Sequence, residues 1–119
     1  MKPVVRKEKE MYAPALRFLN NQPGTKAWLN WNNAIYMPGV GFKRKANHED
    51  GIPDIIGVKK KSFGSISYGQ IYAFELKRKG CLKNVSQAQR LWLERFHLGG
   101  GIGYVVDSIE DLIEAFGEV

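Results

Sequence analysis

The sequence is poor in cysteine and has no long apolar run, and each absence restricts what the protein can be. A single cysteine, Cys81, excludes an internal disulfide and a zinc site built on a CxxC pair. The two histidines, His48 and His97, have no metal-ligating partner at a useful spacing. No stretch approaches the roughly 20 apolar residues of a membrane span, and residues 1–10 lack the apolar core of a signal peptide. We therefore expect a soluble, cytoplasmic protein with no membrane partner.

Positive charge is what the sequence has in excess. Eighteen Lys and Arg residues stand against twelve Asp and Glu, which leaves a net charge of +6. Such a surplus favours a polyanion, for example nucleic acid or an anionic membrane surface. The chain has 119 residues, of which 44% are hydrophobic, so it is long enough to bury one core. We expect a single domain over residues 1–119.

Hydrophobic periodicity predicts the order helix, strand, strand, strand, helix, strand, helix. The first helix is expected to begin near Pro14, because proline would interrupt a helix that started as early as Lys7. The strands are expected early in residues 26–37 and in 52–58, 70–77 and 101–106, and the later helices in 86–98 and 108–116. A strand, helix, strand crossover followed by another helix is typical of an α/β fold in which helices pack on a mixed β-sheet.

Two segments are expected to lie outside this framework. Residues 38–51 are rich in Gly, Lys and Arg without periodicity, which predicts a mobile basic loop. Residues 59–69 have the Ser, Gly and Lys content of an exposed connection between two hairpin strands. The large apolar side chains of the helices are expected in the core, namely Trp92, Phe96, Leu112 and Phe116.

Alternation along residues 70–77 separates an apolar face from a charged one. Tyr72, Phe74 and Leu76 share the face expected in the core. Glu75 and Lys77 share the other face, roughly 6 to 7 Å apart along the strand. Asp54 is the one acid in the apolar run 51–58, and hairpin pairing of the two strands would bring it beside Glu75.

Two carboxylates this close repel each other unless a cation lies between them. Hard oxygen ligands suit Mg²⁺ or Mn²⁺, which would neutralise Asp54 and Glu75 and polarise a phosphodiester. The backbone carbonyl of Leu76 could supply a further oxygen ligand. Lys77 could orient or activate the attacking water, or stabilise the charge that develops on the phosphate.

The motif Pro53-Asp54 followed by Glu75-Leu76-Lys77 resembles the PD-(D/E)XK nuclease motif. Its setting resembles the virus-type replication-repair nuclease (VRR-NUC) family, especially the stand-alone members encoded by phages. The matching pieces are GIPD (51–54), FELK (74–77), SQAQ (86–89), the upstream pair Asn32-Asn33 and SIED (108–111). The resemblance covers nearly the whole chain and implies a restriction-endonuclease-like core.

By this resemblance, Asp54 and Glu75 are metal ligands, Lys77 is the catalytic lysine and Gln89 is an active-site glutamine. Family members usually carry a further acid on the first helix that supports the metal or its waters. Glu8 fits that position best and Glu10 second. Stand-alone relatives act on Holliday junctions as homodimers, so the resemblance implies a dimer, branched DNA as substrate, and a phage or prophage origin.

Several alternatives stay open at this point. Ser86 and Gln89 also form S-x-x-Q, the pattern of a capping box, and this role is compatible with an active-site role. The basic residues near the two motif strands are either solvated or hold the phosphate backbone, namely Lys43, Arg44, Lys45, Lys59, Lys60, Arg78 and Lys79. The enzyme could be a general or restriction-like nuclease or a nickase. The chain could also be a basic nucleic-acid-binding module with no activity.

Overall fold

The computed structural model describes residues 8–30, 35–37, 41–43 and 51–119, with the backbone alone for residues 8, 35–37 and 41–43. Its centre is a four-stranded sheet in the order β1-β4-β5-β6, and β2 and β3 form a separate pair. The strands are β1 (Thr25–Leu29), β2 (Ile35–Met37), β3 (Gly41–Lys43), β4 (Ile55–Phe63), β5 (Ile66–Leu76) and β6 (Ile102–Val106). The helices are α1 (Glu8–Asn20), α2 (Gln87–Leu98) and α3 (Ile109–Gly117).

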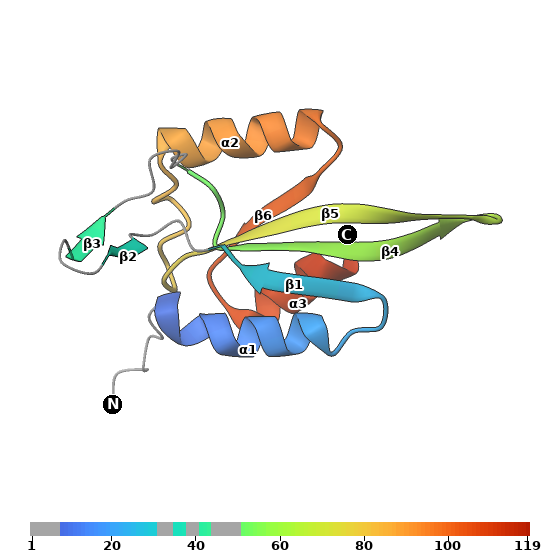
Figure 1. The fold of residues 1–119 in the computed structure, drawn as a ribbon, viewed down its shortest axis with the longest axis horizontal. Helices are drawn as coiled ribbons and strands as arrows, with labels where there is room; N and C mark the ends of the chain where they lie inside the picture. Colours follow the sequence, from blue (N-terminus) through green and yellow to red (C-terminus); the bar gives the residue numbers. More distant parts are fainter. Residues whose placement is uncertain (1–7, 31–34, 38–40, 44–50) are drawn as a thin grey trace.

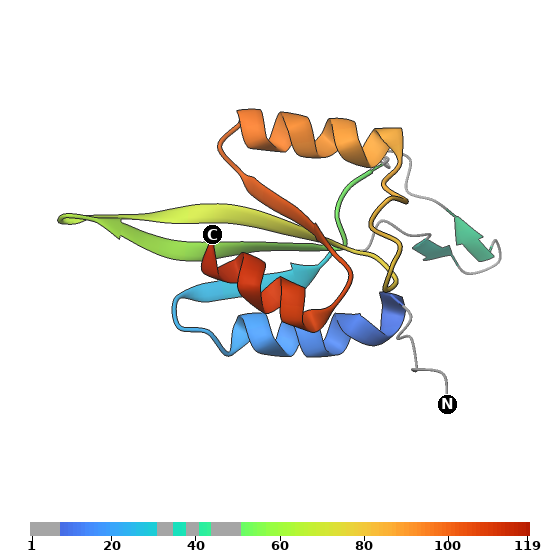
Figure 2. The same ribbon diagram turned by 180° about the vertical axis from the view of Figure 1, so that it is seen from behind.

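The sheet is mixed, as the sequence predicts. β1, β4 and β5 pair antiparallel, whereas β6 runs parallel to β5 because α2 carries the chain back across the sheet. α1 and α3 cover one face and α2 lies over the other (Figures 1 and 2). The expectation of an α/β fold with helices on a mixed sheet is thus confirmed. Within the described part of the chain, no helix has the length and apolar character needed to cross a membrane.

The core lies between the sheet and the pair α1 and α3. Tyr72, Phe74 and Leu76 of β5 are fully buried there, as their alternation predicts. α1 supplies an apolar stripe at four-residue spacing, and α3 supplies Leu112 and Phe116. Trp92 and Phe96 differ from expectation: α2 has no fully buried residue, and these two rings stack on each other with centroids 4.8 Å apart. Phe96 lies against Gly101 and Gly103 at the edge strand β6 instead of filling the core.

Pro14 does not begin the first helix, contrary to the prediction. α1 starts at Glu8 and contains Pro14 in its interior. Met11, Ala15 and Leu19 are buried on both sides of the proline. Burial of this continuous stripe outweighs the lost backbone hydrogen bond, because tertiary packing supplies most of the stability of a helix in a folded protein.

The connection expected at residues 59–69 is largely strand. β4 and β5 stay paired as far as Phe63 and Ile66, so only two residues form the turn. Gly64 makes so short a turn possible because it adopts a φ of 61°. The result is a long hairpin that projects beyond the other elements (Figure 1). Of the basic loop expected at residues 38–51, the described part is β3 and Gly51, and the rest lies outside the described residues together with Asn32-Asn33 and His48.

Phe74 and Phe63 offer a matched test of this core. We expect Phe74→Ala to lower the free energy of unfolding by about 3 to 5 kcal/mol, because Phe74 is fully buried and stacks on Tyr104. Phe63→Ala at the exposed hairpin tip should change it by less than about 0.5 kcal/mol. Denaturant titration of both variants measures the difference, and an equal loss for the two would contradict this placement of the core.

Candidate active site

The register of the central hairpin brings the two motif acids together. Ile55 pairs with Phe74, so Asp54, which directly precedes β4, stands opposite Glu75. Lys77 directly follows β5, and its amide donates to the carbonyl of Val106, which extends the pairing with β6. The adjacency of Asp54 and Glu75 is therefore as the hairpin pattern predicts.

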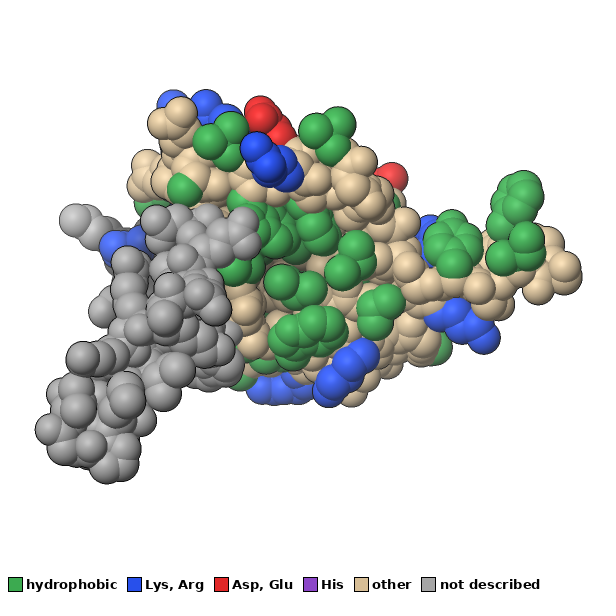
Figure 3. Space-filling model, turned by 45° about the horizontal axis from the view of Figure 1, so that its top comes forward, with side chains coloured by type: hydrophobic (Ala, Val, Ile, Leu, Met, Phe, Trp, Pro, Cys, Tyr) green, Lys and Arg blue, Asp and Glu red, His purple; other side chains and the backbone are tan. Residues whose placement is uncertain are grey.

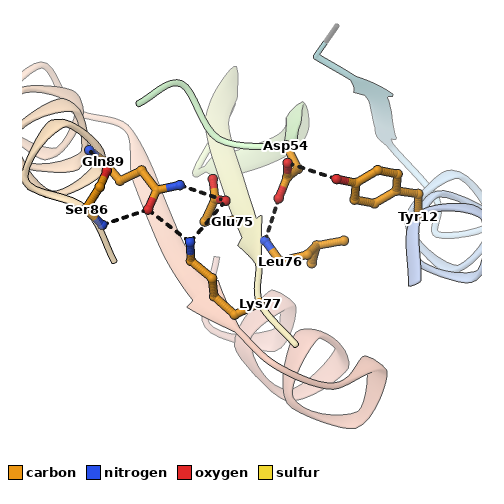
Figure 4. A network of polar contacts seen from close by, with 7 residues as sticks. All are labelled: Tyr12, Asp54, Glu75, Leu76, Lys77, Ser86 and Gln89. Carbon is orange, nitrogen blue, oxygen red and sulfur yellow. Dashed lines mark hydrogen bonds and ion pairs between the residues drawn. The ribbon is translucent and has the colours of Figure 1, made fainter. Parts of the chain in front are cut away.

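Asp54 is held by one backbone and one side-chain donor. Its Oδ2 accepts a hydrogen bond of 2.8 Å from the Leu76 amide, and its Oδ1 accepts one of 3.2 Å from the Tyr12 hydroxyl (Figure 4). Each carboxylate oxygen retains a further lone pair that can bind a cation. Tyr12 is absent from the predicted site, because a tyrosine on an amphipathic helix has no distinguishing sequence pattern.

Glu75, Lys77 and Gln89 form a second group beside Asp54. The Gln89 amide nitrogen donates to Glu75 Oε1 at 3.0 Å, and Lys77 Nζ donates to Gln89 Oε1, also at 3.0 Å. The Lys77 ammonium lies 3.9 Å from the same Glu75 oxygen. Glu75 and Lys77 are only 5% and 8% exposed. Burial of a carboxylate and an ammonium is tolerated here because each has a charged partner and an amide partner.

Gln89 also caps the helix on which it lies. Its side-chain oxygen accepts from the Ser86 amide, and the Ser86 hydroxyl accepts from the Gln89 amide, so the predicted capping box is present. One amide group therefore serves both the helix terminus and the acid–lysine pair (Figure 4). The helix cap and the contacts to Glu75 and Lys77 coexist in the same side chain.

The donor set fits a hard divalent cation. Asp54 and Glu75 supply carboxylate oxygens from adjacent strands, which is the ligand type that Mg²⁺ and Mn²⁺ prefer. Among the described residues, no group of three His, Cys, Asp or Glu side chains is suited to a metal. The Glu8 side chain lies outside the described residues, and Glu10 is exposed on α1. Leu76 contacts Asp54 through its backbone amide, and its carbonyl remains a predicted ligand.

The predicted phosphate-binding residues lie in different places. Lys59 donates to the carbonyls of Phe116 and Val119 at 3.4 and 3.2 Å, on the face covered by α3. Burial, and then the charge of Lys61, lower the pKa of Lys59. Lys60 is exposed on the opposite face of β4. Arg78 and Lys79 are exposed in the loop after β5, whereas the side chains of Lys43, Arg44 and Lys45 lie outside the described residues.

Asp107 organises the loop that leads from Lys77 to α2. It is buried at the end of β6, accepts from the Gly80 amide at 3.0 Å and lies 3.7 Å from the Lys79 ammonium. The Gly80 hydrogen bond is the main cause that holds the pKa of Asp107 below its ordinary value of 3.8. An acid at the end of a buried strand is a weak signal, and Asp107 is not among the predicted residues.

No protein-family model matches this chain, and comparison with curated proteins and with solved structures also returns no match. The VRR-NUC resemblance therefore stays a prediction. The function has to be argued from the geometry of the site.

The pH dependence of stability in Asp107→Asn tests whether the Asp107 carboxylate holds the loop that follows β5. Because the pKa of Asp107 is lowered in the folded protein, its ionised form stabilises the fold above about pH 4, and this contribution is lost as the pH falls through the lowered pKa. We expect the variant to be less stable than wild type by about 1 to 2 kcal/mol near neutral pH. Denaturant titrations across a pH series should show the gap closing in acid; a constant gap would contradict this role.

Stability measurements on variants can separate the helix cap of Gln89 from its contacts with Glu75 and Lys77. Ser86→Ala removes one cap and should cost about 1 kcal/mol. Gln89→Ala also removes a partner from buried Glu75 and Lys77, so we expect a further loss of about 1 to 3 kcal/mol. Gln87→Ala, in the same helical turn and exposed, is the matched control. Equal stabilities of the Ser86 and Gln89 variants would show that the site contacts contribute nothing.

Proposed function

We propose that the chain is a divalent-metal-dependent DNA endonuclease of the PD-(D/E)XK class, a hydrolase of phosphodiester bonds with the architecture of the VRR-NUC family. The observation that carries the proposal is the joint geometry of Asp54, Glu75, Lys77 and Gln89. Glu75, Lys77 and Gln89 contact one another at 3.0 to 3.9 Å, and Asp54 lies opposite Glu75 on the neighbouring strand, where the Leu76 amide holds it at 2.8 Å. Solvent-exposed charged residues without a shared function are not expected to cluster in this way.

The fold supports the same proposal. A helix, an antiparallel set of strands and then a helix crossover to a parallel strand give the order expected of a restriction-endonuclease-like core. The acids stand where β4 begins and β5 ends, so rigid strands hold them. We propose this finer architecture on the element order and on the sequence motif together.

The chemistry follows from the ligand set. Bound Mg²⁺ or Mn²⁺ would neutralise the acids, polarise the scissile phosphate and favour attack by water on phosphorus, with cleavage of the bond to the leaving oxygen. Tyr12 and the Leu76 amide fix the carboxylate of Asp54 in one orientation. The Gln89 amide holds Lys77 Nζ, so the ammonium is positioned to stabilise negative charge on the phosphate or to orient the attacking water.

Branched DNA is the proposed substrate and a homodimer the proposed assembly. The net charge of +6 supports a polyanionic substrate. A small domain with one site needs a second copy to cut two strands of a junction symmetrically. The proposed compartment is the cytoplasm, in agreement with the single unpaired cysteine.

Cleavage of end-labelled DNA by wild type and Glu75→Gln tests the function. With Mg²⁺ or Mn²⁺, we expect paired symmetric nicks on a four-way junction and less cleavage of a flap or a linear duplex. Glu75→Gln and Asp54→Asn should each lower the rate by at least about a hundredfold, and a chelator should abolish it. Glu94→Gln, exposed on α2, is the charge-matched control.

Three outcomes separate the possibilities. Equal cleavage of every substrate would indicate a general nuclease instead of a junction resolvase. Full activity of Glu75→Gln would remove the proposed site. Binding without cleavage by any of these proteins would leave a basic nucleic-acid-binding module.

A further inference from the structure

The face of the sheet that carries Glu75 is only partly covered. α2 packs over β6, where Leu93 lies 2.6 Å from the position that a Cβ on Gly103 would occupy. The rest of this face, over β1, β4 and the middle of β5, carries large side chains that remain open to solvent. Trp28 is 46% exposed, Val58 37% and Ile71 43%. Figure 3 shows hydrophobic side chains gathered on the sheet beside α2.

Strand register makes this open surface a continuation of the candidate site. Alternate residues share a face, so Ile71 lies on the same side of β5 as Glu75. Cross-strand pairs extend that face, because Ile71 pairs with Val58 and Ile56 pairs with Trp28. From Asp54 to Lys60 the strip runs for roughly 20 Å along β4.

Apart from the two acids of the candidate site, the charged residues on this strip are basic. Lys26 pairs with Val58, and Lys60 lies two residues further along the same side of β4; both lysines are exposed. Beyond Asp54 and Glu75, the described strand residues on this side of β1, β4 and β5 include no acid. A shallow hollow of about 350 Å³ adjoins Lys60 and is lined by Gly24, Val58, Lys60, Ser67, Tyr68 and Gly69.

We propose that this open face, defined by Trp28, Val58, Ile71, Lys26 and Lys60, binds an unpaired DNA strand that leaves the candidate site. The inference rests on the proposed nuclease function and names the part of the substrate that the enzyme holds. Trp28 can stack on an unpaired base, and Val58 and Ile71 can pack against neighbouring bases, whereas a duplex hides its base faces. Lys26 and Lys60, at the end of the strip away from Asp54, can contact the phosphates of that strand.

Charge favours this occupant over a second copy of the chain. In a two-fold contact through this face, Lys26 and Lys60 of both copies would be buried in one interface. The two acids of this face, Asp54 and Glu75, lie away from the lysines and already accept hydrogen bonds, and the described strands of this face offer no further acid. The lysines would therefore be buried without a partner, which is costly. A polyanion removes that cost.

Binding without metal tests the surface separately from catalysis. The probe is fluorescein-labelled oligothymidylate in the presence of a chelator, with fluorescence anisotropy as the readout and a labelled duplex for comparison. We expect Trp28→Ser to weaken binding of the single strand by roughly tenfold or more, while Trp28→Phe retains most of it. Duplex affinity should change by less than about twofold.

Further variants keep the test decisive if Trp28→Ser fails to fold, which circular dichroism would show. Lys60→Ala should weaken single-strand binding and lower the slope of log affinity against log salt by about 0.7. The controls are Leu98→Ser, which removes an apolar side chain that is 89% exposed on α2, and Arg17→Ala on the exposed side of α1. Neither control should alter single-strand binding.

The outcomes distinguish this inference from the function it rests on. If the wild type binds the single strand and Trp28→Ser does not, the proposed binding surface is supported. This holds even if no DNA is cleaved and the nuclease proposal fails. Unchanged binding by Trp28→Ser and Lys60→Ala would overturn it, even if the protein cuts DNA. A fall in molar mass from dimer to monomer in Trp28→Ser, by light scattering, would also overturn it in favour of a second copy.

Discussion

The antiparallel register of β4 with β5 is the constraint on which the rest of the structure depends. It buries Tyr72 and Phe74 on one face of the sheet and, by alternation, directs Glu75 to the other. Gly57, the partner of Tyr72, leaves room for that ring, because a Cβ at this position would overlap it. A slip of one residue would expose the aromatic core and bury the acid against α1 and α3. Core packing and site geometry are therefore fixed by the same set of strand pairs.

α2 is attached to the sheet differently from the other helices. It has no fully buried side chain, and polar contacts hold it near both ends. Gln89 connects its first turn to Glu75 and Lys77, and His97 accepts from the Gly103 amide at 3.0 Å near its last turn. Such contacts have stricter geometry than apolar packing. The helix is thereby set at a defined position over β6, and half of the sheet face beside it stays open.

The parts of the structure that follow from local periodicity were predictable from the sequence. Alternation in residues 70–77 predicts the buried face of β5, and the hairpin order predicts that Asp54 lies beside Glu75. The capping box of Ser86 and Gln89 is a short-range pattern, and it is present. The mixed sheet flanked by helices follows from the order of the elements.

The remaining features depend on contacts between distant segments. Pro14 lies inside α1 because Met11, Ala15 and Leu19 are buried around it, which local propensity does not record. Tyr12 reaches Asp54 across 42 positions of sequence, and Asp107 reaches Gly80 across 27.

The shared amide of Gln89 orders the assembly of the site in time. Asp54, Glu75 and Lys77 are synthesised before Gln89, and until α2 forms, the lysine and the acid lack the side chain that holds them. During synthesis, the chain therefore contains Asp54, Glu75 and Lys77 before Gln89 is there to contact the latter two. The contacts of Gln89 with Glu75 and Lys77 need the first turn of α2, which the same side chain caps. Local unwinding of that turn in the folded protein would break the contacts of Gln89 with Glu75 and Lys77. The arrangement of the candidate site therefore depends on whether this one helical turn is formed.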